Sequence, residues 1–191
     1  MKILRTILAS IFLVVAVTLI IAMKMPSEWS TARRLGINAK PETIFPLLVD
    51  LRRWRDWAIW FEHDPNMQIT YSNPSFGIGA HYIWSGNRSV GEGRLELDKI
   101  VNERVLSFHL EMNQGGFVTQ GRIVLDPLEH GTRVTWTFGG SLGNDPFARL
   151  NRRHLENAVG ETLQANLEKL KRIVEDAVPP SPSVKSIAPS P

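Results

Sequence analysis

The residues that could do acid–base chemistry are few, and two of them lie on one predicted strand. Glu92 and Arg94 alternate there with Val90, so the three side chains are expected on one face. A buried carboxylate can act as a base, and an arginine beside it can stabilise an enolate. This pair is therefore a candidate catalytic site that projects into a cavity beside Tyr82 or Trp84. The alternative is an ion pair on the surface, worth less than about 1 kcal/mol.

His63, in the stretch FEHDP, is the third catalytic candidate. It could act as a base at the mouth of a cavity. Its neighbours Glu62 and Asp64 equally suit an exposed loop. His81 and His109 are expected on the polar face of their strands.

Two common sources of catalytic chemistry are missing from this sequence. It contains no cysteine and no H-E-x-x-H zinc motif. We therefore expect no metal site and no cofactor.

A glycine-rich stretch, GAHYIWSGNRSVGEG at positions 79–93, resembles a phosphate-binding loop at first sight. Such a loop must leave a strand and open a helix, so that backbone N–H groups meet the phosphates. Here the glycines lead into another strand, and residues 85–89 are typical of a hairpin turn. Gly91 and Gly93 are then expected to ease strand curvature or allow a close approach.

The middle of the chain predicts an antiparallel sheet. Segments 33–39, 67–72, 80–85, 90–101, 104–112, 117–125 and 132–139 are short, rich in β-branched and aromatic residues, and separated by turn residues. Leu106, Phe108 and Leu110 share one face of their strand, while Ser107 and His109 share the other. One side of the sheet is therefore expected to be dry and the other wet.

Two helical segments flank the predicted strands. Residues 41–54 keep helical spacing despite Pro46, and Trp54, Trp57, Trp60 and Phe61 would form one aromatic stripe if the helix continued. That stripe suits core packing, with a ligand gate, a membrane-dipping patch or a partner surface as alternatives. A long helix should begin at Pro146, with Asp145 as its N-cap. Gly160 within it indicates either a bend or a close packing partner.

The N-terminal segment predicts a membrane anchor. Residues 6–23 carry no charge, and a helix of about 18 residues is close to the roughly 30 Å thickness of the hydrocarbon core. Trp29 would suit the membrane interface. The run lacks the small residues of a good cleavage site, which favours an uncleaved anchor over a secretory signal. The flanking charges are nearly balanced, with a slight preference for an extracytoplasmic domain.

The C-terminal segment, the net charge and the length indicate the domain organisation and the class of partner. Residues 178–191 are rich in proline and serine and are expected to be disordered. The net charge of +3 is modest, and no basic run carries interleaved aromatics, so nucleic acid is not expected as a partner. With 191 residues, of which 43% are hydrophobic, the chain suits one domain with appendages.

The order of these elements resembles a known superfamily. Trp54 and Trp57 before Asp64-Pro65, then GIGAHYIWSGNRSVGEG, then GTRVTWTF and the long C-terminal helix, are similar to the START-like helix-grip (SRPBCC) proteins, in their polyketide cyclase/dehydrase and lipid-transport branch. The resemblance covers residues 29–177. It implies an α+β fold in which a curved antiparallel sheet of about seven strands grips the long helix, around a cavity for lipids, polyketides or other hydrophobic ligands.

The sequence therefore predicts a hydrophobic binding module attached to a membrane through residues 6–23, with 1–25 as the anchor. The alternatives are a cyclase or dehydratase that uses a cavity carboxylate, and an accessory protein that contacts a membrane partner through Trp57 and Trp60. The protein partner, if any, is not indicated. The predicted ligand contacts are Trp57, Trp60, Tyr82, Trp84, Phe108, Leu110, Trp136 and Phe138.

Overall fold

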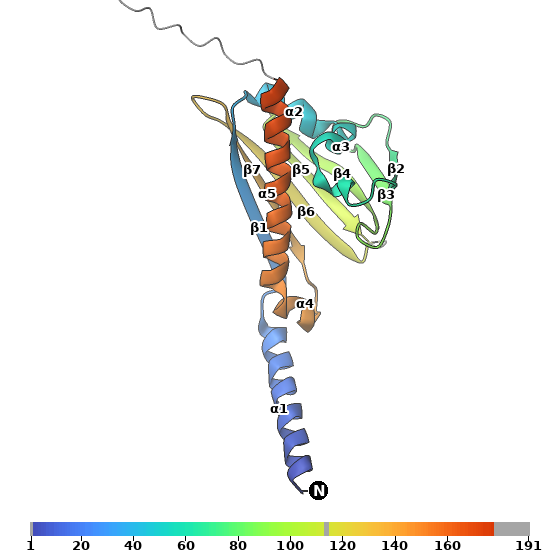
Figure 1. Cartoon of the computed structure of the whole chain (residues 1–191), viewed down its shortest axis with the longest axis vertical. Coiled ribbons are helices and arrows are strands. Elements are labelled where there is room, and N and C mark those ends of the chain that lie inside the picture. Colours follow the sequence, from blue (N-terminus) through green and yellow to red (C-terminus); the bar gives the residue numbers. More distant parts are fainter. Residues whose placement is uncertain (1, 113–114, 178–191) are drawn as a thin grey trace, which may run out of the picture.

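The computed structural model describes residues 2–112 and 115–177 of the chain. The C-terminal segment 178–191, predicted to be disordered, lies outside the described residues. Figure 1 shows a sheet curved beside one long helix, with a separate helical rod extending from the end of the domain. This is the α+β helix-grip fold that the sequence predicts.

The sheet is antiparallel throughout and has the strand order β1-β7-β6-β5-β4-β3-β2. Its strands are β1 (Glu28–Ile37), β2 (Gln68–Tyr71), β3 (His81–Ser85), β4 (Glu92–Val101), β5 (Val105–Met112), β6 (Phe117–Pro127) and β7 (Thr132–Ser141). All seven predicted strands are present. The first begins five residues before its predicted start, since Glu28 already pairs with Ser141 of β7.

The long C-terminal helix is divided into two. Asp145 caps α4 (Pro146–Leu150) as predicted, because its carboxylate accepts from the backbone N–H groups of Phe147 and Ala148. The chain then turns at Asn151, and α5 (Arg152–Ala177) runs along the sheet, mainly against β1. The prediction of one uninterrupted helix from Pro146 is wrong at this point.

Two glycines allow close packing. A Cβ on Gly160 of α5 would lie 2.1 Å from a guanidinium nitrogen of Arg33, so this glycine lets β1 approach the helix. A Cβ on Gly93 would lie 2.5 Å from the ring of Trp84. Of the alternatives predicted for both positions, close approach is the one found here.

The aromatic segment between β1 and β2 is not a single helix. It contains α2 (Pro41–Val49), η1 (Leu51–Arg53), α3 (Trp54–Trp57) and η2 (Ile59–Glu62). Extended backbone at Ala58, with φ −82° and ψ 118°, ends α3. Trp60 then packs against Trp84, whereas Trp54 and Trp57 pack against each other. The continuous stripe predicted from helical spacing is therefore broken, and its members have different surroundings.

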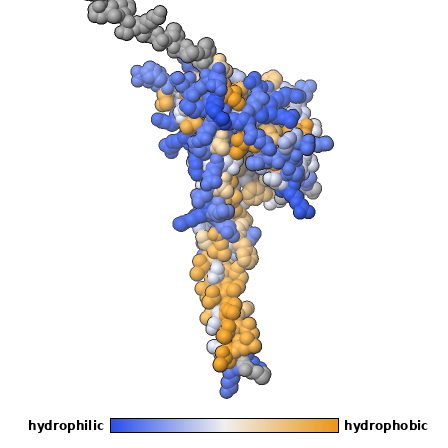
Figure 2. All heavy atoms as spheres, viewed as in Figure 1, coloured by the Kyte–Doolittle hydropathy of each residue, from blue (hydrophilic) through white to orange (hydrophobic). Residues whose placement is uncertain are grey.

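Helix α1 (Lys2–Lys24) stands apart from the domain. It is the one helix among the described residues that is long and apolar enough to cross a membrane, and Ala22 is its only buried residue. Figure 2 shows an apolar rod below a largely polar head. The hydrophobic core of the head runs from Ile37 to Val174 and uses no residue of α1. The hydrophobic core of the head is therefore complete without α1.

Arg149 of α4 connects α1 to the head. One guanidinium nitrogen of Arg149 donates to the carbonyl of Met23 (2.7 Å) and to that of Met25 (3.2 Å), and the other two donate to the carbonyl of Gly143. The last carbonyls of a helix have no partners within it, so Arg149 caps the C-terminal end of α1. Residues 25–27 are all that separate α1 from β1.

Candidate functional site: a cavity between sheet and helix

The inner face of the sheet and the facing side of α5 line a cavity of about 260 Å³. Its wall is almost entirely apolar, and no charged residue of the described chain lines it. The lining residues come from every layer of the head: Trp29, Trp54, Ala58, Trp60, Phe61, Tyr82, Leu95, Phe108, Leu110, Met112, Phe117, Thr119, Trp136, Phe138, Leu155, Val159, Thr162, Leu163 and Asn166.

Alternation along the strands produces this apolar wall. Phe108 and Leu110 point inward from β5, and Trp136 and Phe138 do so from β7, as the sequence predicts. The rings of Phe108 and Trp136 pack edge to face, with centroids 6.3 Å apart. Leu106 and Val134, further along the same faces, are fully buried in the solid part of the core.

The cavity occupies the end of the head from which α1 extends. Trp29 is the second residue of β1, Met112 ends β5, Phe117 begins β6 and Leu155 lies in the first turn of α5. The opposite end is filled by side chains such as Leu167 and Val174, which are at most 1% exposed. The hollow part of the domain is therefore the part nearest helix α1.

Six of the eight predicted ligand contacts line this cavity: Trp60, Tyr82, Phe108, Leu110, Trp136 and Phe138. Trp57 and Trp84 do not. Both are at most 1% exposed, and their indole N–H groups donate to backbone carbonyls, those of Leu47 and Val90 respectively. Both indole rings lie in the hydrophobic core outside the residues that line the cavity. Because Trp57 is fully buried, it cannot form the partner surface considered for the aromatic segment.

Sequence reasoning missed several lining residues. Trp29, predicted for the membrane interface, is 3% exposed and packs against Phe138 with ring centroids 6.0 Å apart. Asn166 lies on the apolar stripe of α5, three residues after Leu163 and four before Leu170, and this position could have revealed it. A polar residue on a buried helix face needs a partner.

The candidate pair Glu92 and Arg94 lies on the opposite face of the sheet from the cavity. Arg94 pairs with Ile83, whereas the inward-facing Tyr82 and Trp84 pair with Leu95 and Gly93. The predicted position beside Tyr82 is therefore wrong. Val90 lies in the turn before β4, and the strand begins only at Glu92. Because Val90 is outside the strand, the alternation of side chains along β4 cannot be counted from it.

Arg94 instead pairs with Glu96 on the outer face. Its guanidinium donates a hydrogen bond to the Glu96 carboxylate, and this bond holds the pKa of Glu96 below its usual range. A carboxyl whose pKa is lower in the folded state than in the unfolded state stabilises the fold at pH values above the unfolded-state pKa. This stabilisation is lost as the pH falls through the folded-state pKa.

Glu96→Gln should therefore lower the free energy of unfolding near neutral pH, by no more than about 1 kcal/mol for a partly exposed pair. The difference from the wild type should disappear at acidic pH, where Glu96 is protonated. Urea unfolding at both pH values measures this. A difference of equal size at acidic pH would show that the ion pair is not its cause.

The third catalytic candidate, His63, is exposed at the start of the loop after η2, and it does not line the cavity. Its backbone carbonyl accepts from the side chain of Asn87. The neighbouring Asp64 is 9% exposed and accepts from the backbone N–H groups of Asn66 and Asn87. The stretch around His63 thus holds the turn between β3 and β4 in place. That turn leads into a strand, so the structure contains no phosphate loop here.

Tyr82 is the cavity residue with the most displaced pKa. Burial raises the pKa of its phenol far above the ordinary value, with a smaller contribution from Tyr71. Burial thus favours the neutral phenol over the phenolate.

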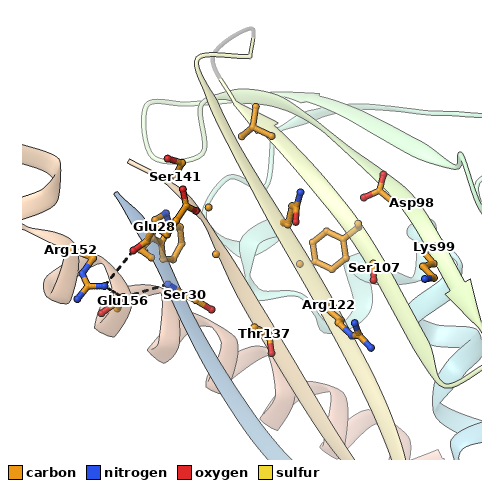
Figure 3. Close-up of a pocket in the computed structure, with 17 residues that line it drawn as sticks. Glu28, Ser30, Asp98, Lys99, Ser107, Arg122, Thr137, Ser141, Arg152 and Glu156 are labelled. Carbon is orange, nitrogen blue, oxygen red and sulfur yellow. Dashed lines mark hydrogen bonds and ion pairs between the residues drawn. The ribbon is translucent and has the colours of Figure 1, made fainter. Parts of the chain in front are cut away.

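A wider depression of about 960 Å³ lies on the outer face of the sheet, along β5, β6 and β7. Figure 3 shows Ser107, Arg122 and Thr137 on the strands and Arg152 and Glu156 on α5. Its wall is a mixture of hydroxyls and charges of both signs, and Arg152 and Glu156 are 3.6 Å apart. It lacks the apolar lining of a hydrophobic site. Among residues 2–112 and 115–177, no three His, Asp or Glu side chains gather as they would around a metal ion.

An α+β sheet that grips a C-terminal helix around an apolar cavity defines the START-like class of proteins. The chain belongs to the family described as polyketide cyclase / dehydrase and lipid transport, whose model matches residues 29–175. None of the curated proteins compared with the chain matches it.

Solved structures share the fold at low sequence identity. A protein of unknown function, SA2116 from Staphylococcus aureus, matches 78% of this chain and 94% of its own with a TM-score of 0.62 and 10% identity. Protein MLL2253 from Mesorhizobium loti matches 78% and 99%, with a TM-score of 0.58 and 13% identity. Ara h 8.0201 matches 78% and 99%, with a TM-score of 0.55 and 12% identity.

Proposed function

We propose that this protein is a membrane-anchored module that binds a hydrophobic small molecule or lipid in the cavity between its sheet and α5. The observation that carries the proposal is the apolar cavity itself. A tightly packed core contains few voids larger than a water molecule, whereas this one holds about 260 Å³ lined by aromatic and aliphatic side chains. The family's description, which includes lipid transport, supports the same function.

The arrangement of α1 supports anchoring. Most of its apolar side chains are exposed, and Ala22 near its C-terminal end is its one buried residue. Next to its end, Phe147 is 65% and Leu150 41% exposed on α4. In the proposed arrangement α1 spans the bilayer, these two side chains contact the interface, and the cavity lies at the membrane end of the head. The side of the membrane is left open.

A cyclase or dehydratase is the second candidate function, on the strength of the family's description. Such an enzyme would need a base near its substrate. No Asp, Glu or His of the described chain lines the cavity, and Glu92, Arg94 and His63 all lie outside it. Binding is therefore the function that the geometry favours.

Residues 26–177, purified without detergent from several hosts, should carry a co-purifying lipid-like molecule. Apolar surface of this extent is more stable when it is covered than when it faces water. Native mass spectrometry would show the bound mass, and extraction would identify it. A head that is folded but consistently empty would contradict the proposal.

A further inference from the structure

The chemical character of the ligand follows from the polar groups of the cavity wall, if the wall binds a ligand as proposed above. Besides the tryptophan indoles, four polar side chains line it: Tyr82, Thr119, Thr162 and Asn166. The indole N–H groups of Trp29 and Trp136 lack partners among residues 2–112 and 115–177, but both nitrogens are fully buried, so a ligand in the cavity does not reach them. The Thr162 hydroxyl donates to the carbonyl of Ala158 (3.1 Å), and the Thr119 hydroxyl donates weakly to that of Leu110 (3.5 Å). These two hydroxyls are thus engaged, which leaves the Tyr82 hydroxyl and the Asn166 amide as the groups that a ligand can bond.

Asn166 has a donor to spare. Its Oδ1 accepts from the backbone N–H of Ile59 at 2.7 Å. Because a backbone N–H can only donate, this contact fixes which end of the amide is oxygen and directs the NH2 group the other way. Asn166 is 5% exposed, and its NH2 group has no hydrogen-bond partner among residues 2–112 and 115–177. A buried donor of this kind favours a ligand that supplies an acceptor.

The charge of the wall restricts the ligand further. No lysine, arginine or histidine of the described chain lines the cavity, and the phenol of Tyr82 is neutral. A carboxylate or phosphate drawn into this space would have no countercharge, which makes its burial strongly unfavourable. The volume admits about nine heavy atoms, at roughly 30 Å³ each, the share of a water molecule in the liquid.

We propose that the cavity selects uncharged, mainly hydrocarbon molecules that carry one oxygen acceptor, such as a ketone, an ester carbonyl or an ether, and that the Nδ2 group of Asn166 donates to this oxygen. Acidic lipids and fatty acid anions are excluded from the cavity. Asn166 is thus a ligand-binding residue that sets specificity, and no catalytic step is involved.

Three probes of similar length test the selectivity on residues 26–177: 2-octanone, nonane and octanoate. NMR titration of the 15N-labelled protein gives each affinity and follows the side-chain NH2 signals of Asn166. We expect 2-octanone to bind about fivefold to tenfold more tightly than nonane, octanoate not to bind measurably, and the NH2 signals to shift with the ketone alone.

Substitutions of Asn166 distinguish the loss of its NH2 donor from a loss of folding. Asn166→Leu should reduce the affinity for 2-octanone to that for nonane. Gln164→Leu, the matched change on the same helix outside the cavity wall, should leave the preference unchanged because that amide donates to the Glu168 carboxylate instead. Should Asn166→Leu fail to fold, Asn166→Asp keeps an acceptor for Ile59 and lacks the NH2 group, so the ketone preference should again be lost.

The outcomes also separate this inference from the proposed function. Equal binding of nonane and 2-octanone, tighter binding of octanoate, or unmoved NH2 signals on ketone binding would overturn the selectivity while the cavity still binds. Binding of none of the three probes would overturn the binding function, and the selectivity with it.

Discussion

Trp57→Ala is expected to destabilise the head by about 3–5 kcal/mol, the range for removing a large buried aromatic side chain. Trp57 is fully buried, lies 4.9 Å from Trp54 and 5.7 Å from Trp136 between ring centroids, and its N–H bonds the carbonyl of Leu47. The substitution would leave a void among these rings and a carbonyl without its donor. Urea unfolding of residues 26–177, followed by circular dichroism, measures the loss.

The exposed Arg55 on the same short helix provides the control, since Arg55→Ala should change the free energy of unfolding by no more than about 0.5 kcal/mol. This comparison also decides between core packing and a partner surface for Trp57. A folded Trp57→Ala protein of near-normal stability that had lost only a protein partner would support the surface and contradict the buried position.

Val159→Trp is expected to abolish ligand binding while the head remains folded. Val159 is half-buried on α5 and lines the cavity, so a larger ring at this position would occupy space that the ligand needs. Affinity for 2-octanone, or for the co-purified molecule, should fall more than about tenfold, which corresponds to 1.4 kcal/mol. NMR titration or native mass spectrometry measures it.

A matched substitution on the outer face separates the effect of filling the cavity from that of adding a tryptophan. Thr135 of β7 faces away from the cavity, so Thr135→Trp should retain the ligand. Unchanged binding in Val159→Trp would place the ligand elsewhere on the protein.

The sheet was predictable because its signal is local. Alternation along β5 and β7 places Phe108, Leu110, Trp136 and Phe138 on the inner face, and pairing with neighbours preserves that alternation. Assigning faces by alternation fails for residues that precede the start of a strand. Val90 lies in a turn, and extrapolating from it put Glu92 on the wrong face.

The parts that could not be predicted depend on contacts distant in sequence. The break at Asn151 accompanies the capping of α1 by Arg149, a contact spanning 126 residues. The role of Asn166 depends on Ile59, 107 residues away. Helical spacing around Trp54 and Trp57 was correct for one turn, but it could not reveal the extended backbone at Ala58 that separates Trp60 from them.

In the proposed arrangement, the short link between α1 and β1 limits how far the head can move from the bilayer. Three residues, 25–27, can extend by no more than about 10 Å, and Arg149 holds even these close to the helix end. In the proposed arrangement the head cannot travel across an aqueous gap to a second bilayer. Its traffic is then restricted to exchange with its own leaflet or with a molecule that comes to it.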